Sequence, residues 1–182
     1  MSKQTQAPQA ARQSGRRPSW LAIPLPKPVA LVLRLGLAVV ALWAAIPKLT
    51  DLAGAQRAVH AYRIFPEAIG NLIGIGLPLL ELAVGLCLLA GLLTRYAAAL
   101  FGLLMLAFVV GITSAWARGL NIDCGCFGGG GDLPAGQGAR YGWEIARDIG
   151  LAGLALYLVL WPASTASLDK VLRLDPAPKG AL

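Results

Sequence analysis

The chain of 182 residues is 57% hydrophobic and 14% charged, and its mean hydropathy is +0.64. A soluble domain of this length does not need so much apolar surface, so the composition excludes an ordinary soluble enzyme and indicates a membrane protein. The formal net charge of +7 fits a basic face beside anionic membrane lipid and requires no nucleic acid as a partner.

The chain begins with a polar segment. Residues 1–27 are rich in Gln, Ser, Ala, Pro and Arg without apolar periodicity, which predicts a disordered tail. We expect one membrane domain over residues 28–162 and a second tail over residues 163–182. A cleaved signal peptide is the alternative for the first segment, because residues 53–55 resemble a cleavage site, but the long polar leader and nearby charges oppose it.

Four apolar runs follow, each close to the length of about 20 residues that a helix needs to cross a bilayer. They are residues 29–46, 71–93, 96–117 and 143–161. In the first run, Arg34 lies about one turn from the start, where its side chain can snorkel to the interface, and Pro47 is expected to end the helix.

Residues 49–65, between the first two runs, place apolar residues at helical spacing. The positions that share one side of this segment are Leu52, Ala55, Val59 and Tyr62. The spacing predicts an interfacial helix on the outer surface of the membrane. The predicted fold is therefore an all-α integral membrane protein, a four-transmembrane-helix bundle with an extracytoplasmic interfacial helix and a CxC loop.

The basic residues predict the orientation. With the amino terminus inside, nine Lys and Arg residues fall in the cytoplasm and five fall outside. The inner set is Lys3, Arg12, Arg16, Arg17, Lys27, Arg95, Lys170, Arg173 and Lys179, and the outer set is Lys48, Arg57, Arg63, Arg118 and Arg140. The positive-inside rule then predicts a multi-pass protein of the plasma (inner) membrane, with both termini cytoplasmic and the loop after residue 117 extracytoplasmic.

That loop carries the sequence Cys124-Gly125-Cys126. Cysteines at i and i+2 point to opposite faces of an extended chain, so a disulfide between them requires a tight turn, which Gly125 permits. The small ring should be strained, and strain marks a disulfide as labile or catalytic. Disulfides form and persist outside the cytoplasm. Cys124 and Cys126 are therefore the candidate catalytic residues, and the glycine run 128–131 is expected to give the flexibility that lets a partner reach them.

Glu81 lies near the middle of the second run, within one turn of Pro78. An ionised carboxylate at that depth is costly, so it is usually paired, protonated or functional. Two interpretations stay open. A protonated Glu81 can hydrogen-bond backbone groups that the proline frees, or Glu81 can handle protons.

The fourth run carries Glu144, Arg147 and Asp148 near its start, at spacings that allow i,i+3 and i,i+4 contacts. A structural ion pair accounts for them. Alternatively, Arg147 lies close enough to the outer surface to favour a thiolate at the cysteine pair, against the opposing charge of Asp123.

Two further residues have simpler interpretations. His60, on the outer segment, is a surface residue or, alternatively, a proton shuttle. Cys87, deep in the second run, is the odd cysteine left over and should behave as a small inert hydrophobe. A zinc site needs more ligands than the loop cysteines and scattered Asp or His residues supply, so no metal is predicted.

The order of these features resembles MauE, the methylamine-utilisation membrane protein family, within the broader DoxX-like group. The matching positions are Lys48, Leu49, Asp51, Tyr62, Arg63, Pro66, Leu77, Pro78, Glu81, Gly85, Gly91, the segment Cys124-Gly125-Cys126-Phe127-Gly128, Trp143 and Arg147. Where the family pattern leads us to expect Arg-Asn, this chain has Arg147-Asp148. The resemblance implies a four-helix membrane protein associated with maturation, processing or transport of the disulfide-rich small subunit of methylamine dehydrogenase.

The first hypothesis for function is a membrane thiol-disulfide component, with Cys124 and Cys126 exchanging with an extracytoplasmic thioredoxin-like protein during maturation of a client protein. Glu81, Arg147 and Asp148 would be supporting polar groups in the membrane. The sequence establishes no cofactor, and a quinone bound among the helices near Arg147 is a candidate electron acceptor. The alternative is a non-catalytic membrane assembly or export factor in which the cysteine pair is a structural disulfide. Enzymatic activity is thus open.

Overall fold

The computed structural model describes residues 27–134 and 136–161. The two predicted tails lie outside the described residues, apart from Lys27, where the first helix begins. The elements in chain order are α1 (Lys27–Thr50), α2 (Leu52–Ala61), α3 (Glu67–Ala90), α4 (Thr94–Ala117), β1 (Ile122–Asp123), β2 (Gly131–Asp132) and α5 (Tyr141–Leu160). The structure is mostly helical, as predicted, but the two short strands depart from the predicted all-α fold.

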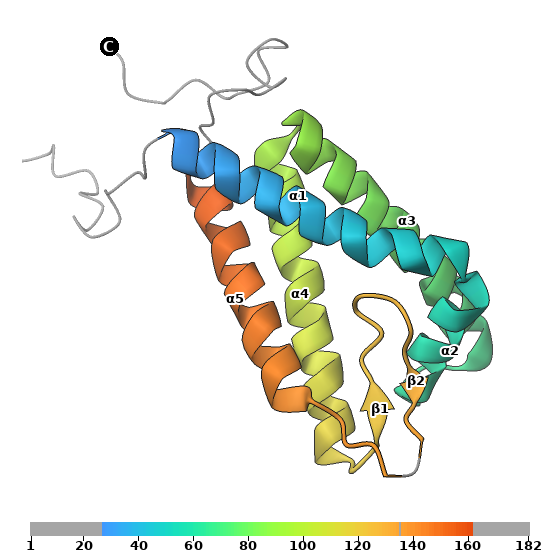
Figure 1. Cartoon of the computed structure of the whole chain (residues 1–182). Coiled ribbons are helices and arrows are strands. Elements are labelled where there is room, and N and C mark those ends of the chain that lie inside the picture. Colours follow the sequence, from blue (N-terminus) through green and yellow to red (C-terminus); the bar gives the residue numbers. More distant parts are fainter. Residues whose placement is uncertain (1–26, 135, 162–182) are drawn as a thin grey trace, which may run out of the picture.

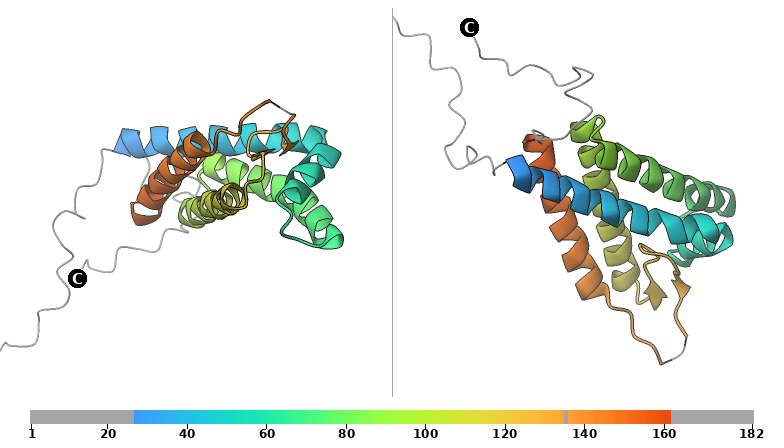
Figure 2. Two further views of the ribbon diagram at one scale, coloured as in Figure 1. Left: turned by 90° about the horizontal axis from the view of Figure 1, so that it is seen from below. Right: turned by 45° about the horizontal axis from the view of Figure 1, so that its top comes forward.

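The long helices pack in two pairs, α1 with α3 and α4 with α5, and α1 crosses over the second pair (Figure 1). The start of α1, the connection between α3 and α4, and the end of α5 lie at one end of the molecule, and α2 with the two strands lies at the opposite end. A second view of the molecule shows the same separation (Figure 2). The end that holds α2 and the strands is called the hairpin end below.

Three helices are long and apolar enough to cross a membrane, over Pro28–Thr50, Glu67–Ala90 and Thr94–Ala117. They correspond to the first three predicted runs. The fourth run forms α5, which has 20 residues and carries its three charged side chains in its first half.

Pro47 does not end the first helix, contrary to expectation, because α1 continues to Thr50. A proline in a helix removes one backbone donor and crowds the preceding turn. Here the carbonyl of Pro47 still accepts hydrogen bonds from the Asp51 N–H (3.2 Å) and from the Thr50 hydroxyl (2.8 Å). The last turn is also tied to α3 through Lys48, so tertiary contacts hold a turn that the local sequence disfavours.

The helix α3 ends three residues before the predicted position. Gly91 takes the left-handed conformation with φ of 67°, and the Leu92 N–H donates to the carbonyl of Cys87 at 2.9 Å. This pattern terminates helices and suits glycine because it has no Cβ to clash. Only a short turn then separates α3 from α4.

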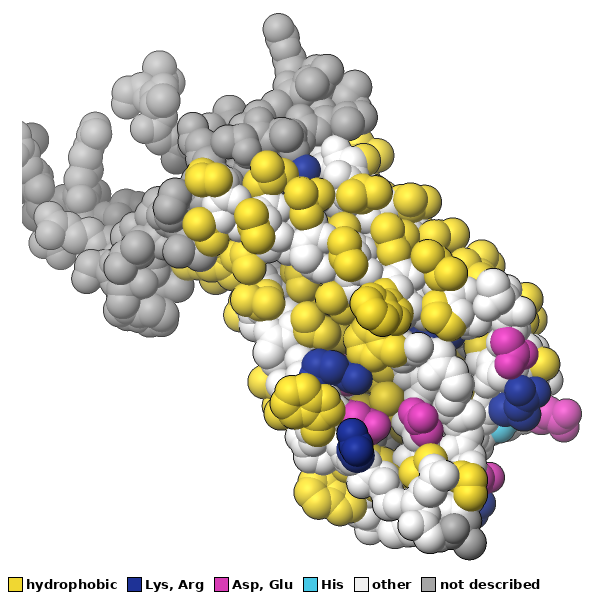
Figure 3. Space-filling view, in the orientation of Figure 1, with side chains coloured by type: hydrophobic (Ala, Val, Ile, Leu, Met, Phe, Trp, Pro, Cys, Tyr) yellow, Lys and Arg dark blue, Asp and Glu magenta, His cyan; other side chains and the backbone are white. Residues whose placement is uncertain are grey.

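Small and large apolar residues alternate in the core between the four long helices, which includes Leu37, Ala38, Leu88, Phe101 and Leu158. The outer surfaces of these helices are apolar as well, and Figure 3 shows hydrophobic side chains covering the part of the molecule over α1, whereas charged side chains gather toward the hairpin end. An apolar exterior of this kind suits contact with lipid rather than water.

Arg34 is only 2% exposed. It therefore lies in the interior, not on an outward route to the interface as the sequence suggested.

The helix α2 forms within the predicted interfacial segment, and the Asp51 carboxylate caps it by accepting the Gly54 N–H at 2.8 Å. The residues of α2 that are buried in the molecule are Gly54, Ala55, Ala58 and Ala61, so this face shares only Ala55 with the apolar side that the spacing predicted. Small residues face inward here because the backbone of other segments comes very close to α2.

Candidate functional site

The cysteine loop is held at the hairpin end by a two-stranded antiparallel ladder. β1 pairs with β2 in the register Ile122 with Asp132 and Asp123 with Gly131. The Tyr141 hydroxyl, at the start of α5, donates to the carbonyl of Leu120 (2.6 Å) and accepts the Ile122 N–H (3.0 Å). The start of the hairpin is thus anchored to α5, and the segment between the strands turns back into the molecule (Figure 1), where it packs against α1 and α2.

Three glycines of this loop permit close packing. The expectation that the run 128–131 is open to a partner does not fit Gly128 and Gly130, whereas a Cβ on Gly129 or Gly131 would have no neighbour closer than 4.0 Å. Gly125 and Gly130 have φ values of 67° and 93°, and a Cβ on either would lie 2.7 Å or 2.5 Å from the Cβ of Ala58 on α2. At Gly128 a Cβ would lie 2.6 Å from Pro47 on α1. No larger residue fits at these positions without a shift, so the glycines seal the loop against α1 and α2.

Cys124 and Cys126 are both thiols, and they are 6% and 3% exposed. The Cys126 N–H points at the Cys124 sulfur, with 3.3 Å between N and Sγ. The carbonyl of Cys124 accepts a hydrogen bond from the Tyr62 hydroxyl at 3.0 Å. The turn at Gly125 therefore brings the two cysteines together, as the spacing predicted, in a buried setting that the sequence did not indicate.

Arg147 of α5 reaches the pair, as one of the two sequence interpretations held. Its Nη2 lies 4.0 Å from the Cys124 sulfur, and its guanidinium carbon stands 4.4 Å from the centroid of the Phe127 ring. Its Nε donates to Oδ1 of the adjacent Asp148 at 2.8 Å. The guanidinium is thus fixed by a ring and a carboxylate while it faces a sulfur, a geometry that favours negative charge on that sulfur.

The two thiols differ in acidity. A hydrogen bond from the Cys126 thiol, helped by the Cys126 N–H and by Arg147, lowers the pKa of Cys124 although burial acts in the opposite direction. The same hydrogen bond, together with burial, raises the pKa of Cys126. Burial also raises the pKa of Tyr62, so its hydroxyl keeps the proton that it donates to the loop. Cys124 is therefore the better nucleophile of the pair.

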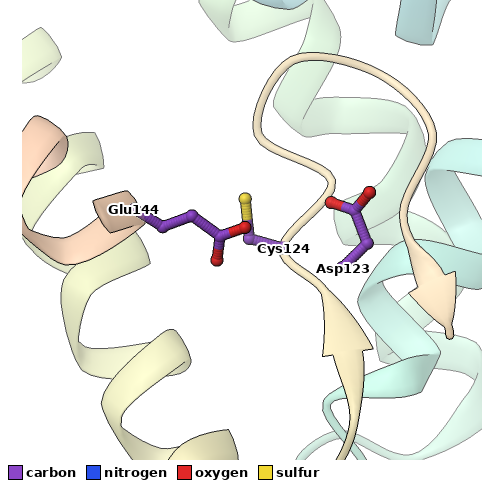
Figure 4. Close-up of side chains that lie close together, drawn as sticks. All are labelled: Asp123, Cys124 and Glu144. Atoms are coloured by element: carbon purple, nitrogen blue, oxygen red, sulfur yellow. The ribbon is translucent and has the colours of Figure 1, made fainter. Parts of the chain in front are cut away.

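Asp123 and Glu144 flank Cys124 (Figure 4), and one ligand atom from each of the three residues lies within 4.8 Å of the others. The Glu144 side chain points at the cysteine from α5, and the Asp123 carboxylate caps the turn by accepting the Gly125 N–H at 3.1 Å. Two carboxylates beside a thiol disfavour the thiolate and oppose Arg147. A structural zinc site takes four protein donors, and this cluster offers three.

Glu81 forms an ion pair with Lys48, a residue that the sequence had counted among the outer charges. Lys48 Nζ lies 2.6 Å from Oε1 and 2.8 Å from Oε2 of Glu81, and the two side chains are 5% and 3% exposed. The bonds of the carboxylate go to Lys48, not to backbone groups freed by Pro78 as one interpretation held. The signal for this partner was present, since a carboxylate at depth calls for a cation and Lys48 follows the first apolar run.

A small cavity connects the cysteine loop with these interior charges. Its volume is about 10 Å³, and its lining includes Glu81, Cys126, Phe127 and Asp148. This space approaches the size of one water molecule and is far too small for a quinone ring. The structure thus brings Glu81 and Asp148 to the same interior space as the second cysteine.

A larger apolar groove, of about 350 Å³, lies between α2, α3 and α4. Tyr62 lines this groove and also lines a cavity of about 40 Å³ that includes Lys48 and Cys124.

The other candidate residues lie away from the thiols. The His60 ring contacts Oδ1 of Asn71 on α3 at 2.9 Å through Nε2, and a Cβ on Gly70 would collide with the ring at 2.5 Å. Cys87 is partly buried at the edge of the helix core. His60 therefore helps to join α2 to α3 instead of serving the cysteine loop.

The long apolar helices define an integral membrane protein, and the folded loop gives it a buried thiol pair at one end. The family model described as methylamine utilisation protein MauE matches residues 26–161, and the chain belongs to this family. The methylamine utilization protein MauE of Paracoccus denitrificans is 31% identical over 126 residues, which cover 68% of this chain and 64% of that protein. No solved structure matches the chain.

Proposed function

We propose that the protein is a membrane thiol-disulfide component that exchanges electrons through Cys124 and Cys126 with an extracytoplasmic thioredoxin-like protein. The observation that carries this proposal is the unequal pair itself. Cys126 and Arg147 favour the thiolate form of Cys124, whereas Cys126, which is adjacent to Cys124, keeps its proton. A nucleophilic cysteine with an adjacent resolving cysteine is the arrangement that thiol-disulfide exchange needs.

The client would be a disulfide-rich extracytoplasmic protein of methylamine metabolism, such as the methylamine dehydrogenase small subunit, or a related protein. Family membership supports this choice. A disulfide handed to the client leaves the pair as a dithiol, which needs an electron acceptor. For this role we propose a quinone dissolved in the bilayer, because the apolar groove shares Tyr62 with the cavity at Cys124.

The same proposal includes a membrane topology. α5 would be the fourth span and α2 would lie at the outer interface of the plasma membrane, with both termini cytoplasmic. The arrangement of the ends supports it, because the start of α1 and the end of α5 lie together, opposite the hairpin end (Figure 1). The hairpin would then face the compartment in which disulfides persist.

The first experiment determines the redox state of the pair in intact cells of a Cys87→Ala strain. Acid quenching, denaturation and alkylation with a mass-shifting reagent count the free thiols, and an impermeant reagent applied to intact cells after mild reduction reports the side of the membrane. The proposal expects both dithiol and disulfide forms, in a ratio that shifts when a thioredoxin-like partner is deleted.

Two variants sharpen this test. Cys126→Ser should accumulate a mixed disulfide through Cys124, whereas Cys124→Ser should not, and Cys87→Ala alone should leave exchange unchanged. If neither single variant yields a mixed disulfide, the exchange reaction is refuted.

A second candidate function is a non-catalytic assembly or export factor in which the pair is a structural disulfide. The burial of both sulfurs and the close packing of the loop glycines favour it, because a working partner must reach Cys124. Under this alternative the pair stays oxidised whichever partner is deleted, and a Cys124→Ser/Cys126→Ser variant loses stability without losing an exchange reaction.

A further inference from the structure

Asp148 has a buried carboxylate of which only one oxygen has a hydrogen-bond partner among the described residues. None of its surface is exposed. Arg147 bonds Oδ1, and Oδ2 is buried without a hydrogen-bond partner among the described residues. Buried polar atoms are nearly always paired, so an orphaned carboxylate oxygen calls for an explanation, and a proton that it receives during function is one.

The surroundings of Asp148 lead to Cys126. Both residues line the cavity of about 10 Å³, together with Phe127. Asp148 also acts electrostatically on the Cys126 thiol, and the cavity that both residues line has room for about one water molecule. Proton transfer between the two groups, direct or through one water, is geometrically reasonable.

The charged groups around this space come from several elements. Arg147 and Glu144 lie on α5 with Asp148. Lys48 on α1 interacts electrostatically with Asp148, and Glu81 on α3 lines the same cavity. α4 contributes Phe101, Leu104 and Met105, which are apolar. Lys48 and Arg147 therefore offset the negative charges of Glu81 and Asp148, and both cations favour the ionised form of Asp148 against the effect of its burial.

The second thiol needs a proton acceptor. Its raised pKa keeps Cys126 protonated, and a protonated thiol is a poor nucleophile. The step that releases a partner from Cys124 requires Cys126 as a thiolate, so a base must act on it.

We propose that Asp148 accepts the proton of the Cys126 thiol when Cys126 attacks the mixed disulfide held on Cys124, an inference that rests on the proposed exchange function. The Cys124 thiolate first attacks a partner disulfide, forms a bond to one partner sulfur and releases the other as a thiolate. Cys126 then gives its proton to Asp148, forms the bond to the Cys124 sulfur and displaces the remaining partner sulfur as a thiolate. In this direction the two cysteines are oxidised by two electrons and the partner disulfide is reduced by two. When the pair hands its disulfide to a client, the same steps run in reverse: a client thiolate attacks the Cys124 sulfur, Cys126 leaves as a thiolate, and Asp148 returns the proton to it.

The test uses the full chain, purified in detergent with Cys87→Ala and reduced, and the aromatic disulfide dithiobis(nitrobenzoate) as the partner. The first release of nitrothiobenzoate reports attack by Cys124, and the second reports ring closure by Cys126. Asp148→Asn should slow the second release about tenfold or more at neutral pH and leave the first within about twofold.

Two readouts separate proton transfer from a structural role. In Asp148→Asn the second release should recover as pH rises, since Cys126 then ionises without help, and Asp148→Glu should restore much of the rate at neutral pH. The matched control is Glu144→Gln, one helical turn earlier and beside Cys124. It should change the first release and spare the second.

The outcomes are distinguishable. An unchanged second release in Asp148→Asn overturns the role of Asp148 and leaves the exchange function standing. Equal slowing of both releases, with no recovery at high pH, also overturns it, because the residue is then only structural. If the native protein gives a first release without a second, the pair does not close and the exchange function itself fails.

Discussion

The buried ion pair between Lys48 and Glu81 provides the sharpest test of how the bundle is held together. Both side chains are at least 95% buried, and Nζ contacts both carboxylate oxygens within 2.8 Å. Removing one partner leaves the other charge buried and uncompensated, which costs about 3–5 kcal/mol. Replacing both partners by apolar side chains of similar length removes the two desolvation penalties together, so the double variant should lie within about 1 kcal/mol of the native protein.

The assay compares Lys48→Met, Glu81→Met and the double variant by reversible unfolding in mild detergent, followed by far-ultraviolet circular dichroism. The double variant should be more stable than either single variant. Arg57→Met is the matched control, because the Arg57–Asp51 pair has a contact of 3.3 Å but side chains that are 66% and 61% exposed, and it should cost less than about 1 kcal/mol. Destabilisation in the double variant that equals the sum of the two single variants would show that the charges do not interact, and would refute the buried pair.

Three further predictions concern the loop. Gly130→Ala should weaken the packing of the cysteine loop on α2 by about 1–3 kcal/mol. This loss should appear as roughly 5- to 150-fold faster alkylation of the two cysteines. The control is Gly138→Ala, where a Cβ meets nothing within 4 Å, and it should leave the alkylation rate unchanged. Because the Cys126 thiol lowers the pKa of Cys124, alkylation of Cys124 should begin at lower pH in the native protein than in Cys126→Ala, and identical pH profiles would contradict the hydrogen bond. Tyr62→Phe removes the donor to the carbonyl of Cys124 and should destabilise the protein by about 1–3 kcal/mol, measured by thermal unfolding.

The sequence predicted the helices well where hydropathy alone decides. The second and third apolar runs match α3 and α4 within a few residues at each end, because a membrane span is a property of a continuous segment. The helix ends were less predictable. Pro47 is a local signal for termination, yet α1 continues through it because Lys48 is tied to another helix.

The glycine run shows a second limit of local reasoning. Glycine allows both flexibility and close approach, and the sequence offers no means of choosing between them. At Gly128 and Gly130 the tertiary structure requires close approach, because Pro47 and Ala58 occupy the space that side chains there would need, whereas a Cβ on Gly129 or Gly131 would have no neighbour closer than 4.0 Å.

The sequence by itself determined that this is an apolar helical membrane protein with a Cys124-Gly125-Cys126 turn, because hydropathy and spacing along the chain need no knowledge of distant contacts. The tertiary structure decided the rest of the site. The Lys48–Glu81 pair joins residues 33 positions apart, and Arg147 meets Cys124 across 23 positions. Such contacts depend on how the helices pack, so only the folded chain reveals that the two thiols are buried and that Asp148 shares a cavity with Cys126.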